Sequence, residues 1–433
     1  MASNRYDESS VKINREDRDK IRQSPTMYIP SQSVEGALSI FSEPLSNSID
    51  ELDNTDVGSD ILVTFDEKTK EISVKDDGRG VPLGKFYELF TIISASGKFS
   101  NDETTAYTTS GGIFGTGSCT MVYLSTSCII RSSREGKYLE YEFKDGICKG
   151  KKEGKTKEHG TYVRFTIDQK FCDINSLTID HIKDLMEEKS YLFPNIRMKL
   201  VLYKNGKQVN DWKFVNNDIA DWVASKKPDT EILRIKTKRT VTYLKNIDDD
   251  KLTSSKVDVD IALAFKEEVL DKGPDEFIIT CANSIKTYMG GTHLDGCRDG
   301  IVKWFRQCVV PNFKGKDKDL QVTPTDITAG LCAFIAVKAS HVVFRAQHKD
   351  KLDNAEIRIA VRDAVFEALR DAKSSVTNPM AEFIKRVAKG RVASKKVRKK
   401  NVDNAFSKDK PKKYKPINYT VRTTWPEVLL AEG

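Results

Sequence analysis

The chain has 433 residues and a net charge of +8; 39% of the residues are hydrophobic and 31% are charged. This composition is typical of globular proteins, and the length predicts two or three domains. No stretch approaches the roughly 18 uninterrupted apolar residues of a membrane span, and the polar first residues resemble neither a secretory signal nor a transit peptide. Eight cysteines without a C-x-x-C pair indicate free thiols in an intracellular, cytoplasmic protein rather than a zinc or redox site.

The positive charge is concentrated near the C-terminus. Residues 385–415 contain fourteen Lys or Arg and two Asp, a net charge of +12, so the rest of the chain is slightly acidic. A basic segment on a nearly neutral body is typical of a contact with a polyanion, most simply the phosphates of double-stranded DNA. The alternative is a solvated helix followed by a linker, which is what most charge runs are.

The first half of the chain predicts an alternation of helices and hairpins. Residues 1–20 show no periodicity and are interpreted as an extended arm, and the Ser-, Thr- and Gly-rich residues 96–112 as a loop. Apolar residues at helical or alternating spacing predict a long helix over 34–52, strands over 60–65 and 71–75, hairpin strands over 137–167, a helix over 174–191 and a hairpin over 196–209.

A second alternation of strands and helices begins near residue 232. Its predicted elements are strands over 257–265, 276–281 and 331–337 and a helix over 354–372. We therefore expect a first domain to about residue 230 and a second to about 375, followed by a long helix and the basic tail.

The predicted long helix carries the first candidate site residues. Glu43, Asn47 and Asp50 are spaced i, i+4 and i+7 and so share one face. A carboxylate there can activate a water for attack on a phosphate, and an amide oxygen one turn later can bind Mg²⁺. The alternative is an ordinary polar face turned to water.

Three further short segments carry candidate ligand contacts. The run Asp76-Asp77-Gly78-Arg79-Gly80 follows a predicted strand, where two glycines allow close backbone approach to a ligand, although such sequences also form plain turns. The glycine-rich run over 111–117, which includes Gly112, Phe114, Gly115, Thr116 and Gly117, precedes an apolar helix and can present backbone N–H groups to phosphates. It lacks the Lys-Ser/Thr ending of a Walker A loop. Thr161 begins an alternating strand after His159-Gly160.

The order of these four weak signals resembles the Bergerat ATP-binding fold shared by gyrases, heat-shock chaperones, histidine kinases and MutL proteins. The resemblance implies an α+β sandwich of a mixed sheet with helices on one face, with ATP and Mg²⁺ bound between the helices. It implies that Glu43 is the general base, that Asn47 binds Mg²⁺, and that Asp76 and Thr161 hold the adenine. The other implied nucleotide contacts are Asp50, Asp77, Gly78, Gly80, Gly112, Phe114, Gly115, Thr116 and Gly117.

Further strings are similar to the gyrase B, topoisomerase IV and topoisomerase II branch of that group, the type IIA topoisomerases. Residues 1–12 resemble the arm that crosses to the partner subunit, which implies that Tyr6 contacts nucleotide. The run 96–99 resembles the start of the lid and implies a contact from Lys98. Gly290-Gly291-Thr292-His293-Leu294 matches the transducer domain (a fold like ribosomal protein S5 domain 2), and Gln347-His348-Lys349 stands at its Gln-Thr-Lys loop. Lys349 would reach the γ-phosphate, with Gln347 in support.

Two positions depart from the family pattern. Phe114 stands where gyrases have His and many topoisomerases have Asn, and His348 replaces the central Thr of the Gln-Thr-Lys loop. The first departure puts one phosphate contact in doubt.

The resemblance implies an ATP-binding domain over 1–230 with its dimer arm over 1–20, a transducer over 231–405 with a long basic helix, and a linker with the first toprim strand over 406–433. The chain is expected to hydrolyse ATP and form a homodimer, without cutting DNA itself. The toprim and cleavage region would lie on the rest of the subunit or on a separate one, in a bacterial or a viral system. The alternatives are a MutL-like repair clamp and a non-catalytic DNA-binding scaffold.

Overall fold

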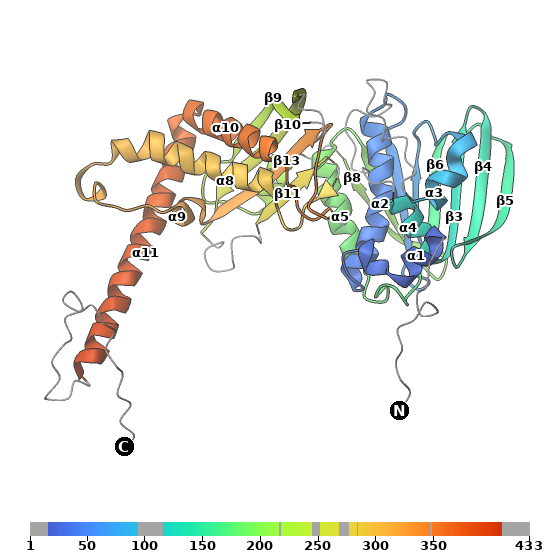
Figure 1. The fold of residues 1–433 in the computed structure, drawn as a ribbon, viewed down its shortest axis with the longest axis horizontal. Coiled ribbons are helices and arrows are strands. Elements are labelled where there is room, and N and C mark those ends of the chain that lie inside the picture. Colours follow the sequence, from blue (N-terminus) through green and yellow to red (C-terminus); the bar gives the residue numbers. More distant parts are fainter. Residues whose placement is uncertain are drawn as a thin grey trace, which may run out of the picture.

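The computed structural model describes residues 16–93, 116–215, 218–244, 252–267, 277–283, 285–346 and 349–408, with side chains of the last helix described to residue 396. It contains two sheets that lie one after the other along the long axis, each with its own helices (Figure 1). Within the described residues, no helix is long and apolar enough to span a bilayer.

The first sheet is mixed and has eight strands in the order β5-β4-β3-β6-β2-β1-β7-β8. All of its neighbouring strands are antiparallel except β1 and β7, which run parallel. The strands are β1 (Asp60–Asp66), β2 (Ile72–Asp76), β3 (Ser125–Arg134), β4 (Lys137–Lys144), β5 (Ile147–Lys155), β6 (Gly160–Ile167), β7 (Arg197–Lys204) and β8 (Lys207–Phe214).

Helices cover one face of this sheet (Figure 1). They are α1 (Asp17–Gln23), α2 (Val34–Asp53), α3 (Phe86–Thr91), α4 (Gly117–Tyr123) and α5 (Ile179–Leu192), with the short turns η2 (Pro25–Met27) and η3 (Leu83–Lys85). The apolar stripe of α2, with Phe41, Leu45 and Ile49 fully buried, packs into the core between the helices and the sheet. The long helix predicted from periodicity is therefore confirmed.

Two predicted boundaries in this part were wrong. The arm predicted over 1–20 overlaps α1, because a seven-residue helix in which only Ile21 is buried gives too few apolar positions to show a period. The helix predicted from residue 174 begins at Ile179, where a capping box formed by Thr178 and His181 starts it.

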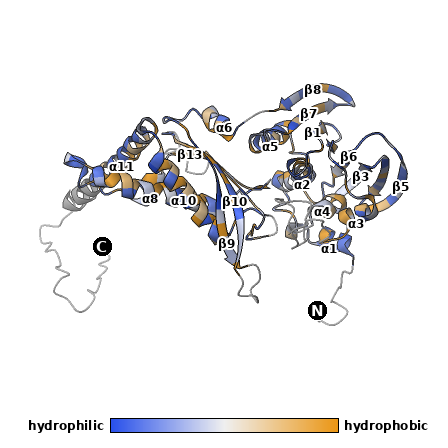
Figure 2. Ribbon diagram, turned by 90° about the horizontal axis from the view of Figure 1, so that it is seen from above, coloured by the Kyte–Doolittle hydropathy of each residue, from blue (hydrophilic) through white to orange (hydrophobic). Residues whose placement is uncertain are grey.

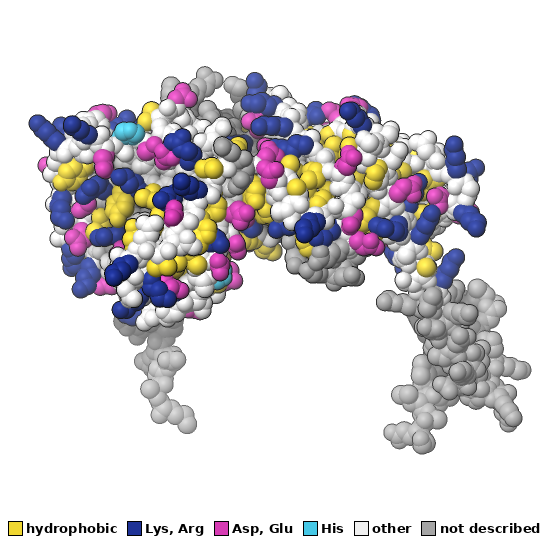
Figure 3. Space-filling model, turned by 180° about the vertical axis from the view of Figure 1, so that it is seen from behind, with side chains coloured by type: hydrophobic (Ala, Val, Ile, Leu, Met, Phe, Trp, Pro, Cys, Tyr) yellow, Lys and Arg dark blue, Asp and Glu magenta, His cyan; other side chains and the backbone are white. Residues whose placement is uncertain are grey.

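The opposite face of the first sheet is charged. Seen from behind, basic and acidic side chains are interleaved over the molecule (Figure 3). Lys199 on β7 pairs with Asp211 on β8 at 3.1 Å, and Lys75 on β2 pairs with Glu158, just before β6, at 3.1 Å. These pairs are partly exposed and contribute little to stability.

The second sheet has five strands in the order β12-β11-β13-β10-β9, with β11 and β13 parallel. The strands are β9 (Leu233–Leu244), β10 (Leu252–Phe265), β11 (Ile278–Ala282), β12 (Ile285–Lys286) and β13 (Leu331–Ala339). The helices that follow or join them are α6 (Ile219–Ser225), α8 (Thr292–Trp304), α9 (Pro324–Thr328), α10 (Ala355–Asp371) and α11 (Ser374–Lys408), with short turns η4 (Phe305–Val309), η5 (Val310–Asn312) and η6 (Gly315–Asp317).

Helices α8 and α10 pack closely because glycines of α8 face the backbone of α10. A Cβ at Gly296 would lie 2.4 Å from the Arg358 carbonyl oxygen, and a Cβ at Gly300 would lie 2.6 Å from that of Arg362. These helices cover one face of the second sheet, with their apolar residues in its core.

The two parts of the chain share an apolar cluster. Helix α6 lies beside the second sheet, and α5 lies at the edge of the first part (Figure 2). The ring of Phe334 on β13 meets Tyr191 of α5 and Trp222 of α6 edge to face, with centroids 6.4 and 5.6 Å apart. Burial of these rings attaches the second sheet to the first part without directional bonds.

Replacing Phe334 by Ala should destabilise the chain by about 3 to 5 kcal/mol, because it leaves a cavity in the shared cluster. Urea unfolding followed by tryptophan fluorescence would measure this loss through Trp222. Leu252→Ala is the matched control, since Leu252 is 65% exposed. A Phe334→Ala effect no larger than that of Leu252→Ala would contradict the assignment of this cluster as a core.

Candidate functional site

The predicted acidic helix and the predicted glycine-rich loop meet at Glu43. Gly117 begins α4 against α2, and a Cβ at Gly117 would lie 2.0 Å from Glu43 Oε2. One turn further along α2, Asn47 Nδ2 donates to Ser118 Oγ at 3.3 Å. Only a glycine leaves room for the carboxylate here, so the structure gives a physical reason for Gly117 at this position.

A lysine from the second part of the chain reaches the same carboxylate. Lys349 Nζ lies 3.5 Å from Glu43 Oε1, and the Lys349 side chain is only 8% exposed, against 27% for Glu43. The sequence interpretation placed these two residues at one site, and the structure brings them together.

The Gly290–Gly291 segment holds the backbone that follows Lys349. Met289 N–H donates to the Asp350 carbonyl at 2.9 Å, Leu352 N–H to Gly290 at 3.2 Å, and Thr292 N–H to Leu352 at 3.0 Å. Gly291 has a φ of +131°, and a Cβ there would lie 2.3 Å from the Leu352 carbonyl oxygen. The two glycines therefore allow a backbone contact that fixes the segment after Lys349.

A buried histidine lies two residues after Gly291 in the chain. His293 is fully buried, and its Nε2 lies 3.1 Å from Thr287 Oγ1. Burial lowers the pKa of His293 to about 3, so the ring is neutral at physiological pH. In the sequence this residue stood out only as part of a family string, and its burial beside Thr287 indicates a packing role.

Asp76 lies at the end of β2 and is almost completely buried. Its Oδ1 accepts hydrogen bonds from the Thr161 and Gly78 amides at 3.0 and 3.1 Å, and its Oδ2 accepts one from Ser48 Oγ at 2.8 Å. Burial raises the pKa of Asp76 to about 6, although the hydrogen bonds oppose that shift. Ser48 was not identified from the sequence, since a serine inside a helix carries no separate signal.

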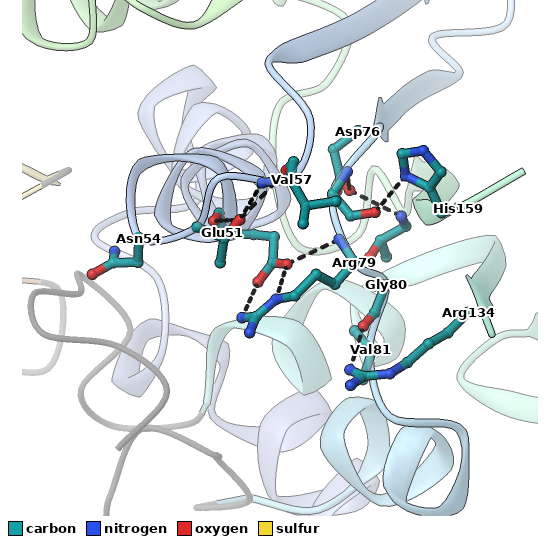
Figure 4. A network of polar contacts seen from close by, with 12 residues as sticks. Glu51, Asn54, Val57, Asp76, Arg79, Gly80, Val81, Arg134 and His159 are labelled. Atoms are coloured by element: carbon teal, nitrogen blue, oxygen red, sulfur yellow. Dashed lines mark hydrogen bonds and ion pairs between the residues drawn. The ribbon is translucent and has the colours of Figure 1, made fainter. Parts of the chain in front are cut away.

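The glycine turn after Asp76 is held by a polar network (Figure 4). Glu51 on α2 accepts two hydrogen bonds from the Arg79 guanidinium, at 2.8 and 3.0 Å, and one from the Arg79 amide at 3.0 Å. Arg134 Nη1 donates to the Gly80 carbonyl at 3.1 Å, and His159 Nδ1 lies 2.9 Å from the Gly78 carbonyl oxygen. Sequence reasoning missed Glu51, although its spacing of eight residues from Glu43 places it two turns along α2.

Two predicted contacts have their carboxylates engaged elsewhere. Asp77 Oδ1 accepts from the amides of Ser59 and Asp60, both at 2.8 Å, and so fixes the start of β1. Asp50 is 4% exposed and lies close enough to Lys189 to raise the pKa of that lysine, which burial, the larger effect, lowers. The nucleotide contacts predicted for Asp50 and Asp77 stay predictions.

Several predicted contacts lie outside the described residues. These are Tyr6, Lys98, Gly112, Phe114, Gly115 and Gln347, together with the departure at His348. Thr116 is described, and its carbonyl accepts from the Thr120 amide and hydroxyl at 3.0 and 2.8 Å, which fixes the first turn of α4.

The Asn47 amide oxygen is suited to a hard cation that also binds oxygens of a ligand. The described residues contain no group of three or more His, Cys, Asp or Glu that could hold a metal ion by themselves. Asn47 donates from its amide nitrogen to Ser118, and its amide oxygen is the atom suited to a hard cation. One protein oxygen completed by ligand oxygens and water is how Mg²⁺ is commonly held beside phosphates.

The predicted basic segment is partly neutralised within the chain. Near the middle of α11, Arg386 pairs with Glu267 at 3.4 Å, Lys389 with Asp317 at 2.7 Å and Arg391 with Asp326 at 2.6 Å. Lys395 and Lys396 are exposed further along the helix. Residues 386–391 therefore present fewer unpaired positive charges to a polyanion than the net charge of the segment indicates.

The raised pKa of Asp76 predicts a pH dependence of stability. The folded chain retains a proton at Asp76 up to about pH 6, whereas an unfolded Asp releases it near pH 3.9. Stability is therefore lost as the pH rises through this window, by about 3 kcal/mol. Asp76→Asn should remove this component, as measured by the free energy of unfolding at pH 4.5 and 7. If the free energy of unfolding changes between pH 4.5 and 7 by the same amount in Asp76→Asn as in the wild type, the assignment is wrong.

Comparisons with known proteins agree with this geometry. A family model described as DNA gyrase B matches residues 212–402. The gyrase B protein of Mycoplasma genitalium is 31% identical over 384 residues, which are 84% of this chain and 56% of that protein. The B-type subunit of topoisomerase 4 from Staphylococcus epidermidis is 29% identical over 379 residues, 84% of this chain and 54% of that protein. The chain thus spans about half the length of these curated relatives.

Solved structures share the fold. The 43K ATPase domain of Thermus thermophilus gyrase B, in complex with an aminocoumarin, is 24% identical with a TM-score of 0.58 and covers 88% of this chain and 97% of its own. The ATPase region of Saccharomyces cerevisiae topoisomerase II is 19% identical with a TM-score of 0.60 and covers 87% and 99%. The expected α+β Bergerat fold is confirmed. Together with the sequence relatives, it shows that the chain is similar to gyrase B, to the B-type subunit of topoisomerase 4 and, in fold, to the ATPase region of topoisomerase II.

Proposed function

We propose that this chain is the ATP-hydrolysing, dimerising gate of a type IIA DNA topoisomerase, which couples ATP binding and hydrolysis to DNA strand passage. The observation that carries the proposal is the position of the Glu43 carboxylate. It lies between the backbone at Gly117 and the ammonium of Lys349, which comes from the second part of the chain. A scaffold with a degenerate site would have no need to preserve a buried lysine beside a carboxylate across two domains.

Each of these residues has a distinct role in phosphoryl transfer. Glu43 orients and deprotonates the attacking water. Lys349 offsets the charge that develops on the transferred phosphoryl group, and Mg²⁺ held through Asn47 supplies further neutralisation when it is bound. Asp76, already ordered by Ser48 and Thr161, accepts a hydrogen bond from the exocyclic amine of adenine. Gly78, Gly80, Thr116 and Gly117, with Gly112, Phe114 and Gly115, line the nucleotide.

Lys349 makes the site sensitive to the third phosphate. The backbone that follows Lys349 is bonded to the Gly290–Gly291 segment, so a change in what its ammonium contacts is transmitted to the second part of the chain. Departure of the γ-phosphate removes one attachment between the two parts and allows them to turn. Gln347 supports the same contact.

The partners follow from the same proposal. Two chains form a homodimer by exchanging their N-terminal arms, with Tyr6 and Lys98 near the partner-facing side of the nucleotide. Double-stranded DNA passes along the basic helix after residue 375. The toprim and cleavage region acts from the rest of the subunit or from a separate one, in the cytoplasm.

The catalytic test is Glu43→Gln, because glutamine keeps the shape beside Gly117 and removes the base. We expect kcat for ATP hydrolysis to fall by about 10²- to 10⁴-fold, with nucleotide binding retained. The wild-type rate should rise faster than linearly with protein concentration, since the active form is a dimer. Glu35→Gln, in the first turn of the same helix, is the control. Wild-type chain that binds no nucleotide would overturn the proposal.

The DNA test is the double variant Lys395→Ala and Lys396→Ala. For each phosphate that the chain no longer neutralises, the slope of log K against log salt should become shallower by about 0.9. Lys204→Ala with Lys207→Ala, at the exposed β7–β8 turn, is a control with the same change of charge. Equal effects of the two double variants on DNA affinity would remove the role of α11.

A further inference from the structure

Three ion pairs between described residues of the two parts each have the acid on the first part and the lysine on the second. They are Glu43–Lys349, Asp53–Lys338 and Glu188–Lys286. Of these pairs, Glu43–Lys349 is the one whose groups are assigned to the nucleotide. The other two pairs therefore need a different explanation.

The Asp53–Lys338 pair has a restricted geometry. Lys338 Nζ lies 3.0 and 2.8 Å from the two carboxylate oxygens of Asp53 and 4.4 Å from the ring centroid of Phe193. Both charged side chains are 28% exposed. This pair differs from an ordinary surface ion pair in three ways: both side chains are partly buried, the ammonium contacts both carboxylate oxygens, and it also lies over an aromatic ring.

Both lysines that reach α2 come from one continuous segment of the second part. Lys338 lies near the end of β13, and the chain continues from there to Lys349. On α2, Glu43 and Asp53 are separated by ten residues, which is about 15 Å at 1.5 Å per residue. The same helix is therefore attached at two points, and a helix held at two points cannot tilt against that segment.

We propose that the Asp53–Lys338 pair is a fixed pivot that positions Lys349 against Glu43. Resting on the proposed function, this assigns different roles to the two attachments: the Lys349 contact changes with the state of the phosphate, whereas the Asp53–Lys338 contact persists. When the Lys349 attachment breaks, the second part turns about the Asp53–Lys338 pair. Asp53 and Lys338 are positioning residues, since neither reaches the groups assigned to the nucleotide.

The structure has space for such a turn. A pocket of about 870 Å³ is lined by residues of both parts, among them Glu188 and Tyr191 of α5 and Lys286 and Arg298 of the second part. A close-packed boundary would resist rotation, whereas this cavity can change volume without exposing the core. The Glu188–Lys286 pair spans this side and limits how far it opens.

The chain offers a natural pair of labels for the motion. Cys148 on β5 and Cys308 on η4 are partly exposed, one in each part, whereas the other six cysteines are buried. Burial raises the thiol pKa of those six, which slows their reaction with a maleimide. Nitroxide labels on Cys148 and Cys308 therefore report the distance between the two parts by pulsed electron resonance, without nucleotide.

The test compares Asp53→Asn, Lys338→Met and the charge exchange Asp53→Lys with Lys338→Glu, with Asp211→Asn as the control for loss of a sheet-face ion pair. We expect both single variants to broaden the label distance distribution. They should also lower kcat for ATP hydrolysis by about ten- to a hundredfold, because Lys349 is misplaced by the order of 1 Å, with little change in KM. The charge exchange should restore a narrow distribution and most of kcat.

The outcomes separate this proposal from the one on which it rests. Failure of the wild type to hydrolyse ATP counts against the proposed function, and the label distances still test the pivot. An unchanged distance distribution in Asp53→Asn overturns the pivot, and so does a charge exchange that restores nothing while the chain remains folded. Equal broadening in Asp211→Asn would show a general effect of charge loss and would overturn it as well.

Discussion

The rest of the structure depends on the contact of the Glu43 carboxylate with two segments far apart in the chain, the backbone at Gly117 and the side chain of Lys349. Gly117 approaches it from α4, at a distance that no side chain at 117 would permit, and Lys349 approaches it from the second part. Moving α4 would remove one wall of the carboxylate, and moving the second part would remove its counter-charge. A single carboxylate thus sets the relative positions of three segments, which is how a local chemical change can become a movement of a whole domain.

The adenine side of the site, unlike the phosphate side, is fixed by contacts within the first part of the chain. Asp76 is held by hydrogen bonds from Ser48, Gly78 and Thr161 before any ligand arrives. Burial makes its ionised form costly, and a donor from a ligand offsets part of that cost. Rigid ordering is suited to recognition of a base that does not change during the reaction. The phosphate side, by contrast, depends on a contact between domains that can be broken.

Local patterns in the sequence predicted elements whose apolar period is long, such as α2, and several strands of both sheets, but not β3 or β9. Helix α1 was missed because seven residues with one buried position carry no period. Spacing gives a face but not a partner: the Asp77 carboxylate contacts the backbone before β1, and Asp50 lies close to a buried lysine. The juxtaposition of Glu43 and Lys349 came only from the family resemblance. Pairings between elements far apart in the sequence, such as Arg391 on α11 with Asp326 on α9, leave no local trace.

The boundary between the two parts combines two kinds of interaction with different tolerance to movement. The cluster around Phe334, Tyr191 and Trp222 is apolar, so its free energy depends on buried area and changes little when rings slide. The ion pair of Asp53 and Lys338 is directional, and its free energy falls steeply with distance. An apolar cluster alone would allow the parts to drift, and ion pairs alone would be weakened by water and salt. Together they restrict the permitted motion to a turn about the directional contact, on the side where the cavity between Glu188 and Arg298 leaves room.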